Sequence, residues 1–200
     1  MVDKYANFAE LSAGEVAGDY KIVCQNRQSD VVIAAPHGGS IEPGTSEIAM
    51  ALAGDELSYY LFEGHKAGNN RDLHITSARF DEPQGLALMR QAKTVITIHG
   101  EASSGNVVYV GGLYSFLSDI LTRSLIEKGF VVQRHSNPSL QGTNPENICN
   151  IGTGNKGVQL ELSQGVRKAM FSSLSRQGRS QPTAYLTRFC QGIREALEQV

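Results

Sequence analysis

Short apolar runs alternate with helical patterns along the chain, and this alternation limits the possible fold more than any other feature. Runs rich in β-branched and aromatic residues predict strands at residues 20–24, 31–35, 57–62, 94–98, 107–110, 131–133 and 158–162. Helical patterns occupy residues 46–53, 82–92, 114–128 and 183–197. Several predicted strands are apolar at consecutive positions, which is typical of strands covered on both faces. The chain is therefore predicted to form an α/β sandwich, with a mixed, mostly parallel sheet flanked by helices.

A chain of 200 residues has a usual size for one domain, so we expect a single domain over residues 1–200. Apolar residues make up 40% of the chain and charged residues 19%, and these proportions exclude a disordered chain. The 18 basic and 20 acidic side chains lack the basic excess of a general nucleic-acid binder. The 3 widely spaced cysteines suggest neither a disulfide framework nor a zinc knuckle.

The first twenty residues lack the basic start and the continuous apolar stretch of a secretory signal. No run approaches the roughly 18 apolar residues that a membrane helix needs. We therefore expect a monomer that is made in the cytoplasm and has neither a membrane nor a nucleic acid as its partner.

Polar residues lie at the carboxyl ends of three predicted strands. His37 follows the second strand within the segment His-Gly-Gly, His99 follows the fourth strand, and Glu161 lies near the end of the last. In open α/β sheets, ligands bind outside the carboxyl ends of the strands. A single histidine in such a place is more often a hydrogen-bonded structural residue, but two together indicate a functional site.

A metal ion explains this arrangement best. A hydrolytic zinc site needs neutral imidazoles and a carboxylate, and it keeps one position for water. Glu42 follows His37 closely enough for a short loop to wrap both around one ion, and His99 would complete the set. Glu47 competes for the carboxylate role, but it falls inside a predicted helix and is expected to be solvated. Glu161 would then remain free to take a proton from water as a general base.

Other catalytic chemistries find little support in the local sequence. The His37-Gly-Gly segment is similar to the oxyanion loop of esterases, but the chain contains no G-x-S-x-G nucleophile motif. A G-x-G-x-x-G motif at residues 152–157 comes at the end of a long loop predicted at 136–156 and is followed by a strand, the reverse of a dinucleotide-binding fingerprint. Nothing near His135 suggests a cysteine with a lowered thiol pKa.

Six blocks of the sequence carry a resemblance to a known family: PHGGSIEPGTSEIA, YYLFEGHKAGNNRDLHITSARFDEP, ITIHG, VGGL, NPENICN and GNKGVQLELS. In this order, within residues 31–167, they resemble the phage-type poly-γ-glutamate hydrolases. The H-x4-E spacing of His37 and Glu42 also belongs to that family. The resemblance implies a fold like that of zinc carboxypeptidases, in which the first two ligands usually follow the pattern H-x-x-E. This difference argues against carrying over the substrate-binding arginines of carboxypeptidases.

The resemblance also implies Zn²⁺ as the cofactor, with His37, Glu42 and His99 as its ligands and Glu161 as the general base. Enzymes of this family cleave the γ-amide of poly-γ-glutamate, whose every repeat keeps a free α-carboxylate, so the implied partner is an anionic polypeptide. Cations would pair with these carboxylates, asparagines would bind amides or cap turns, and a histidine would orient a ligand or line the cleft. The candidate substrate-binding residues are Arg71, His74, Asn147, Asn150, Lys156 and Arg167.

The resulting prediction is a zinc-dependent hydrolase of γ-glutamyl amide bonds that reaches its polymer after host lysis. One alternative is a zinc amidohydrolase or deacylase that acts on another N-acyl amino acid or on a cell-wall γ-glutamyl bond. The other alternative is a phage protein that binds polyanions without catalysis. A panel of amide substrates would distinguish the enzymes, and a zinc assay would test the non-catalytic reading.

Overall fold

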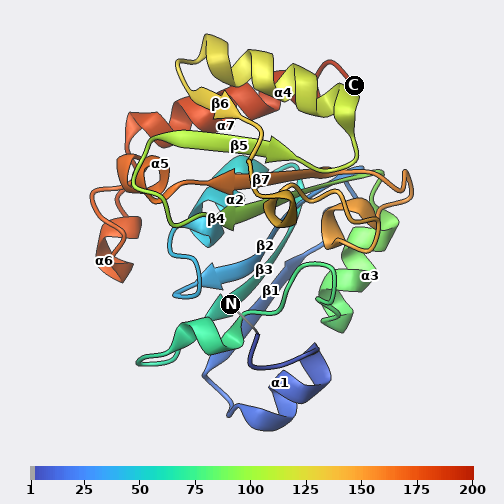
Figure 1. The fold of residues 1–200 in the computed structure, drawn as a ribbon, viewed down its shortest axis with the longest axis vertical. Helices are drawn as coiled ribbons and strands as arrows, with labels where there is room; N and C mark the ends of the chain where they lie inside the picture. The colour runs from blue at the N-terminus through green and yellow to red at the C-terminus, as the bar shows by residue number, and fades with distance from the viewer. Residues whose placement is uncertain (1–2) are drawn as a thin grey trace.

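The computed structural model describes residues 3–200, and a seven-stranded mixed sheet forms its centre (Figure 1). The strand order is β1-β3-β2-β4-β7-β5-β6. Neighbouring strands are parallel from β3 through β2 and β4 to β7, and also between β5 and β6. The other two pairs, β1 with β3 and β5 with β7, are antiparallel. The strands are β1 (Tyr20–Gln25), β2 (Val31–Gly39), β3 (Ser58–Gly64), β4 (Thr94–Gly100), β5 (Val107–Gly111), β6 (Val131–Gln133) and β7 (Val158–Leu162).

The predicted mixed, mostly parallel sheet and all seven predicted strands are therefore confirmed, with shifts at several ends. The four predicted helices are also present, as α2 (Thr45–Ala53), α3 (Pro83–Gln91), α4 (Ser115–Glu127) and α7 (Ala184–Leu197). Glu82 was predicted to lie inside α3 but is its N-cap, where its carboxylate accepts hydrogen bonds from the backbone of Gln84 and Gly85.

Several short helices were not predicted, because elements of one or two turns are too short to show a helical repeat. The predicted loop at residues 136–156 contains two of them. The short helices are α1 (Phe8–Gly14), α5 (Gln164–Ala169), α6 (Arg176–Arg179), η1 (Asn70–Leu73), η2 (Pro138–Leu140) and η3 (Ile148–Asn150), of which the last three are 3-10 helices.

The two faces of the sheet form two separate apolar clusters. In β2, Ile33 and Ala35 belong to the cluster with α2, α4 and α7, whereas Val32 and Ala34 belong to the cluster with α1 and α3. Successive residues of a strand point to opposite faces, so β2 must be apolar at every one of these positions. Covering on both faces, the basis of the sandwich prediction, is confirmed.

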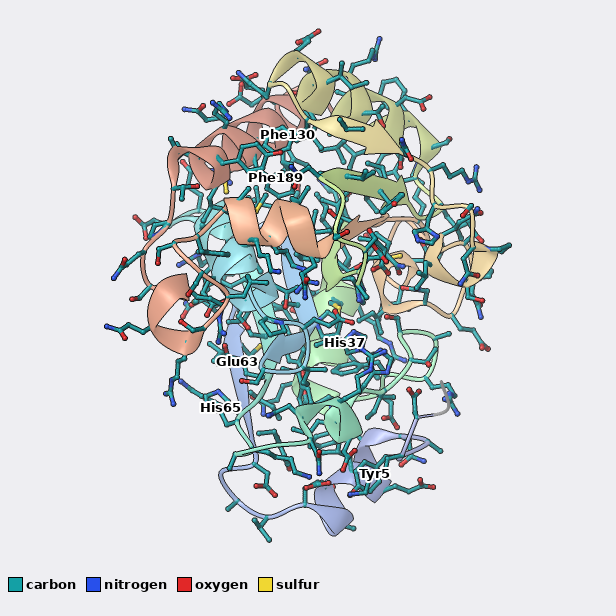
Figure 2. All side chains as sticks on the ribbon, turned by 60° about the vertical axis from the view of Figure 1, so that its left-hand side comes forward. Tyr5, His37, Glu63, His65, Phe130 and Phe189 are labelled. Atoms are coloured by element: carbon teal, nitrogen blue, oxygen red, sulfur yellow. The ribbon has the colours of Figure 1, made fainter. Side chains whose placement is uncertain are left out.

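Helix α7 packs through an apolar face into the cluster that contains Ile33 and Ala35. Phe189 and Ile193 are buried, and Thr183 caps the helix by accepting a hydrogen bond from the backbone of Tyr185. Figure 2 shows Phe130 and Phe189 in the layer where α4 and α7 lie, well away from His37. No helix within residues 3–200 combines the length and the apolar character required to cross a bilayer.

Candidate active site

Three adjacent parallel strands bring their carboxyl ends together at one edge of the sheet. β2 carries His37, β4 carries His99 and β7 carries Glu161. His99 and Glu161 are direct partners in the β4–β7 register. Both histidines were expected just beyond the strands, but β2 and β4 continue through them to Gly39 and Gly100. Backbone pairing with β7 therefore fixes the position of His99, whereas His37 lies where the β2–β3 register shifts between Ala35 and Gly38.

A tight turn after β2 returns Glu42 to His37. Gly39 has a φ of 63°, and a Cβ at this position would lie 2.6 Å from the carbonyl oxygen of Gly64. Only glycine fits such a conformation and such a close approach. The backbone N–H of Glu42 then donates to the carbonyl of His37 at 2.9 Å, which closes the turn.

His37, Glu42 and His99 form a compact set of metal-ligand atoms. Nδ1 of His37 lies 3.3 Å from Oε1 of Glu42 and 3.2 Å from Nδ1 of His99. Nδ1 of His99 lies 3.8 Å from Oε2 of Glu42. All three side chains are buried, and one ligand atom from each lies within 4.8 Å of the others. Two imidazoles and one carboxylate suit zinc and leave a coordination position for water or substrate.

Contacts around this set orient its ligand atoms. Nε2 of His37 lies 2.8 Å from the carbonyl oxygen of Ile75, which accepts its proton and leaves the Nδ1 lone pair for a metal. Oε2 of Glu42 accepts a hydrogen bond of 2.8 Å from the backbone N–H of Gly100. A free imidazole nitrogen that faces an oriented carboxylate fits a metal centre.

The charge states also suit metal binding. Burial, helped by the nearby His37, lowers the pKa of His99 to about 3, so this imidazole is neutral. Burial by itself raises the pKa of Glu42, but its interactions with His37 and His99 and the hydrogen bond from the Gly100 N–H bring it down to about 2. A neutral imidazole and an ionised carboxylate are the forms that bind a metal.

Glu161 faces the same cavity but lies outside the ligand set. Its Oε1 accepts a hydrogen bond of 2.9 Å from Nε2 of Gln159. Burial raises the pKa of Glu161 well above its usual value, and the carboxylates of Glu42 and Glu101 raise it further. A buried carboxylate with increased proton affinity beside a metal centre suits general acid–base chemistry.

The cavity over this edge has a volume of about 1060 Å³. Two of the predicted substrate-binding residues, Arg71 and His74, lie on its rim. Nη1 of Arg71 lies 3.6 Å from Oε1 of Glu42, and its side chain is 51% exposed. The ring of His74 stacks on His37 with 4.0 Å between centroids, and its Nδ1 lies 2.7 Å from Oδ1 of Asp3. Burial lowers the pKa of His74 to about 4.

The two predicted asparagines differ in their position relative to the cavity. Asn147 lines the cavity and caps η3, since its Oδ1 accepts from the backbone of Cys149. Asn150 is buried, and its side chain bonds to backbone groups of Leu113, Gly142, Asn144 and Gly157. The structure therefore shows Asn150 bracing loops outside the cavity lining.

Lys156 and Arg167 also lie outside the residues that line this cavity. Nζ of Lys156 lies 4.1 Å above the ring of Tyr114. Arg167 is buried and donates to three backbone carbonyls, those of Pro43, Glu101 and Leu162. Both had been predicted to meet substrate carboxylates, but the tertiary structure gives their charged groups partners within the protein.

The expectation that Glu47 is solvated is wrong. It lies in α2 as predicted, yet its Oε1 accepts a hydrogen bond of 2.7 Å from Nε of Arg179 in α6. The partner lies far along the chain in a helix that the sequence did not reveal. Glu47 is therefore held in an ion pair and is not among the residues that line the cavity.

The residues that line the site and that sequence reasoning missed include Asp3, Glu101 and Gln159. Gln159 could have been predicted from the sequence, because it lies two residues before Glu161 in β7 and must face the same side of the sheet. Glu101 follows His99-Gly100 directly. Asp3 left no signal, because the loop that carries its partner His74 is remote in sequence.

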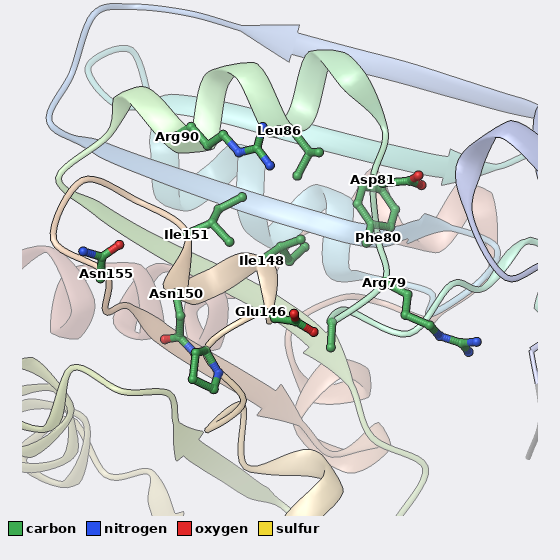
Figure 3. Close-up of a pocket in the computed structure, with 12 residues that line it drawn as sticks. Arg79, Phe80, Asp81, Leu86, Arg90, Glu146, Ile148, Asn150, Ile151 and Asn155 are labelled. Atoms are coloured by element: carbon green, nitrogen blue, oxygen red, sulfur yellow. The ribbon is translucent and has the colours of Figure 1, made fainter.

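A second hollow, of about 620 Å³, lies between α3 and the segment that includes η3 (Figure 3). Leu86, Ile148 and Ile151 line it together with Arg79 and Arg90. Among the residues described, its lining includes no histidine, cysteine, serine or threonine. The groups that suit hydrolysis therefore gather in the larger cavity.

A buried His-Glu-His set beside an unligated glutamate, at the carboxyl edge of an α/β sheet, defines a metallohydrolase type of site. Comparison with known proteins gives the family. The model of the poly-gamma-glutamate hydrolase family matches residues 5–192. The chain belongs to this family, so the predicted resemblance to hydrolases is confirmed.

Two Bacillus subtilis (strain 168) proteins are similar in sequence. The SPbeta prophage-derived UPF0714 protein YoqZ is 42% identical over 179 residues, which are 89% of this chain and 65% of YoqZ. UPF0714 protein YndL is 39% identical over 180 residues, which are 89% of this chain and 71% of YndL. The chain thus spans about two thirds of the length of these relatives.

Two solved structures have the same fold. A bacteriophage poly-gamma-glutamate hydrolase matches with a TM-score of 0.94 and 30% identity, over 99% of this chain and 98% of that chain. The zinc-free apo form of YNDL matches with a TM-score of 0.93 and 36% identity, over 98% of both chains. These matches confirm the α/β fold prediction over nearly the whole chain.

Proposed function

We propose that this chain is a zinc-dependent hydrolase that cleaves γ-glutamyl amide bonds of poly-γ-glutamate. The observation that carries the proposal is the buried set of His37, Glu42 and His99 in the same cavity as Glu161. Family membership supports the substrate, and the zinc-free form of a YNDL structure supports zinc as the metal.

His37 and His99 would each hold zinc through Nδ1, and Glu42 would hold it through a carboxylate oxygen. Zinc, when bound, lowers the pKa of a coordinated water to about 7 and polarises a carbonyl group. Glu161 removes a proton from the attacking water and later returns it to the amine that leaves. This division of roles requires neither a serine nor a cysteine nucleophile.

Recognition of the polymer is assigned to the rim of the cavity. Each repeat of poly-γ-glutamate carries an α-carboxylate, and Arg71 presents a half-exposed guanidinium beside the metal site. His74 lines the same wall, where its neutral ring can accept or donate a hydrogen bond. Arg71 and His74 are therefore the proposed contacts for the carboxylate next to the scissile bond.

The test is incubation of purified protein with poly-γ-glutamate, with and without a metal chelator, followed by sizing of the products. We expect shorter polymers without chelator, an intact polymer with it, and recovery when zinc is added back. α-Linked polyglutamate is the matched control, and it should remain intact. Cleavage that survives complete zinc removal would contradict the proposal. A preference for other acylated amino acids would favour the alternative amidohydrolase.

The monomeric state, synthesis in the cytoplasm and release of the protein on host lysis stay predictions. Sizing the protein in solution tests the first. Comparing the cell and medium fractions before and after lysis tests the other two.

A further inference from the structure

Glu161 is held at one oxygen by a chain of two buried amides. Nε2 of Gln159 donates to Oε1 of Glu161 at 2.9 Å, and Nδ2 of Asn147 donates to Oε1 of Gln159 at 2.8 Å. Gln159 is 3% exposed and Asn147 is 7% exposed. The side-chain hydrogen bonds within residues 3–200 include one to Oε1 of Glu161 and none to Oε2, so only one carboxylate oxygen is fixed.

Two backbone groups determine which way the amides face. The N–H of Cys149 donates to Oδ1 of Asn147 at 3.0 Å, so the amide nitrogen of Asn147 is left for Gln159. The carbonyl of Leu140 accepts from Nε2 of Gln159 at 3.3 Å, so the nitrogen of Gln159 lies on the side of Leu140 and Glu161. Either amide in the opposite orientation would place two acceptors, or two donors, face to face.

We propose that Gln159 and Asn147 are positioning residues that fix Oε1 of Glu161 and leave Oε2 as the oxygen that exchanges the proton during hydrolysis. This inference rests on the proposed function, because it takes Glu161 as the general base. It also gives Asn147 a role different from substrate binding. A base whose carboxylate can rotate spends less time in reach of the water, so loss of the amide chain lowers the rate of the chemical step.

The decisive variant is Asn147→Asp, which replaces the side-chain amide nitrogen by an oxygen and keeps the volume of the side chain. A carboxylate at residue 147 still accepts from the backbone of Cys149, but it cannot donate to Gln159. Gln159 then turns its amide toward residue 147 and presents its oxygen to Glu161. We expect kcat to fall about 10- to 100-fold, the usual effect of removing a contact that orients a site residue, with zinc content unchanged.

Asn144→Asp is the matched control. Asn144 lines the same cavity, and its Oδ1 accepts from the backbone of Glu146 at 2.9 Å, a bond that aspartate keeps. Both variants add one negative charge near an anionic substrate, so both should raise KM. Only Asn147→Asp should lower kcat. Equal kcat in the two folded, zinc-loaded variants would overturn the proposal.

A double-mutant cycle separates positioning from general damage. Gln159→Leu removes the donor to Glu161 and should lower kcat about as much as Asn147→Asp. Adding Asn147→Asp to Gln159→Leu should then cause no further fall. Additive losses in kcat would contradict the proposal that Asn147 acts on Glu161 through Gln159. If Gln159→Leu does not fold, the comparison of Asn147→Asp with Asn144→Asp tests the proposal by itself.

A crystal structure of the metal-free Asn147→Asp variant gives a readout that needs no activity. We expect the amide of Gln159 to be reversed and the carboxylate of Glu161 to be rotated from its wild-type position. An unmoved Glu161 carboxylate would contradict the inference even if the wild type hydrolyses the polymer. If the wild type cleaves no poly-γ-glutamate while Glu161 does rotate in the variant, the proposed function fails and the positioning role stands.

Discussion

The floor and the rim of the cavity are built in different ways. The floor comes from β2, β4 and β7, which carry His37, His99 and Glu161 on paired strands between two apolar clusters. The rim comes from the irregular segment around η1, where Arg71 and His74 are held by side-chain contacts to Glu42 and Asp3. The floor is therefore buried within the paired strands and suits the chemical step, whereas the rim presents the half-exposed Arg71 and suits recognition of a flexible polymer.

The largest effect is expected from the floor, in His99→Ala. Removal of one of three ligands should reduce zinc from about one ion per chain to a small fraction and abolish hydrolysis, because the water is no longer activated. Metal analysis, with circular dichroism as a check of folding, measures this. His65→Ala, at a histidine beside Glu63 that does not line the cavity, is the control and should keep zinc and activity. Full zinc occupancy in His99→Ala would remove His99 from the ligand set.

The next largest effect should come from Glu161→Gln, which keeps the size of the side chain but cannot accept a proton. The rate should fall roughly 10²- to 10⁴-fold with zinc retained, the usual scale for a general base. Steady-state kinetics and metal analysis of the same preparation measure the two outcomes. Glu127→Gln at the exposed end of α4 is the control. Loss of zinc would instead make Glu161 a ligand.

Arg167→Leu tests whether a buried cation supports the floor instead of binding substrate. The variant removes the hydrogen bonds to the carbonyls of Pro43, Glu101 and Leu162. The Leu162 carbonyl keeps a bond from the N–H of Glu101, but the other two carbonyls lose this partner. We expect a loss of about 2–4 kcal/mol in the free energy of unfolding, measured by urea titration. A stable variant with a greatly increased KM would show that Arg167 reaches the substrate.

The smallest effect is expected at the rim, in Arg71→Ala. An exposed ion pair contributes about 0.2–1 kcal/mol, which corresponds to a rise in KM of roughly fivefold or less. The wild-type KM should also increase with salt, since charges are screened over about 10 Å at 0.1 M. Lys156→Ala, whose cation lies over Tyr114, is the matched control and should keep the wild-type KM. If the two variants behave alike at every salt concentration, Arg71 does not recognise the polymer.

The order of these effects sharpens the contrast between floor and rim. If Arg71→Ala reduced kcat as strongly as Glu161→Gln, the rim would take part in the chemical step. If His99→Ala left hydrolysis intact, the strand ends would be a structural feature and the reaction would have to be sought elsewhere in the cavity.

The sequence by itself determined the strands, the sandwich and the set of residues on the floor. Strand periodicity is a local property, and parallel strands present their carboxyl ends at one edge, so His37, His99 and Glu161 were predictable from their places after apolar runs. Glu42 was predictable because a short, glycine-containing turn joins it to His37. The resemblance to the family rests on the same local blocks.

Only the tertiary structure decided which polar side chains face the cavity and which stabilise the fold. Arg71 and Arg167 look alike as cations in matching blocks, yet Arg71 lies on the rim and Arg167 is buried against three carbonyls. Asp3 meets His74, and Glu47 meets Arg179, across long separations in the chain. Such partners depend on how loops and helices pack onto the sheet, and neither periodicity nor short-range spacing encodes that packing.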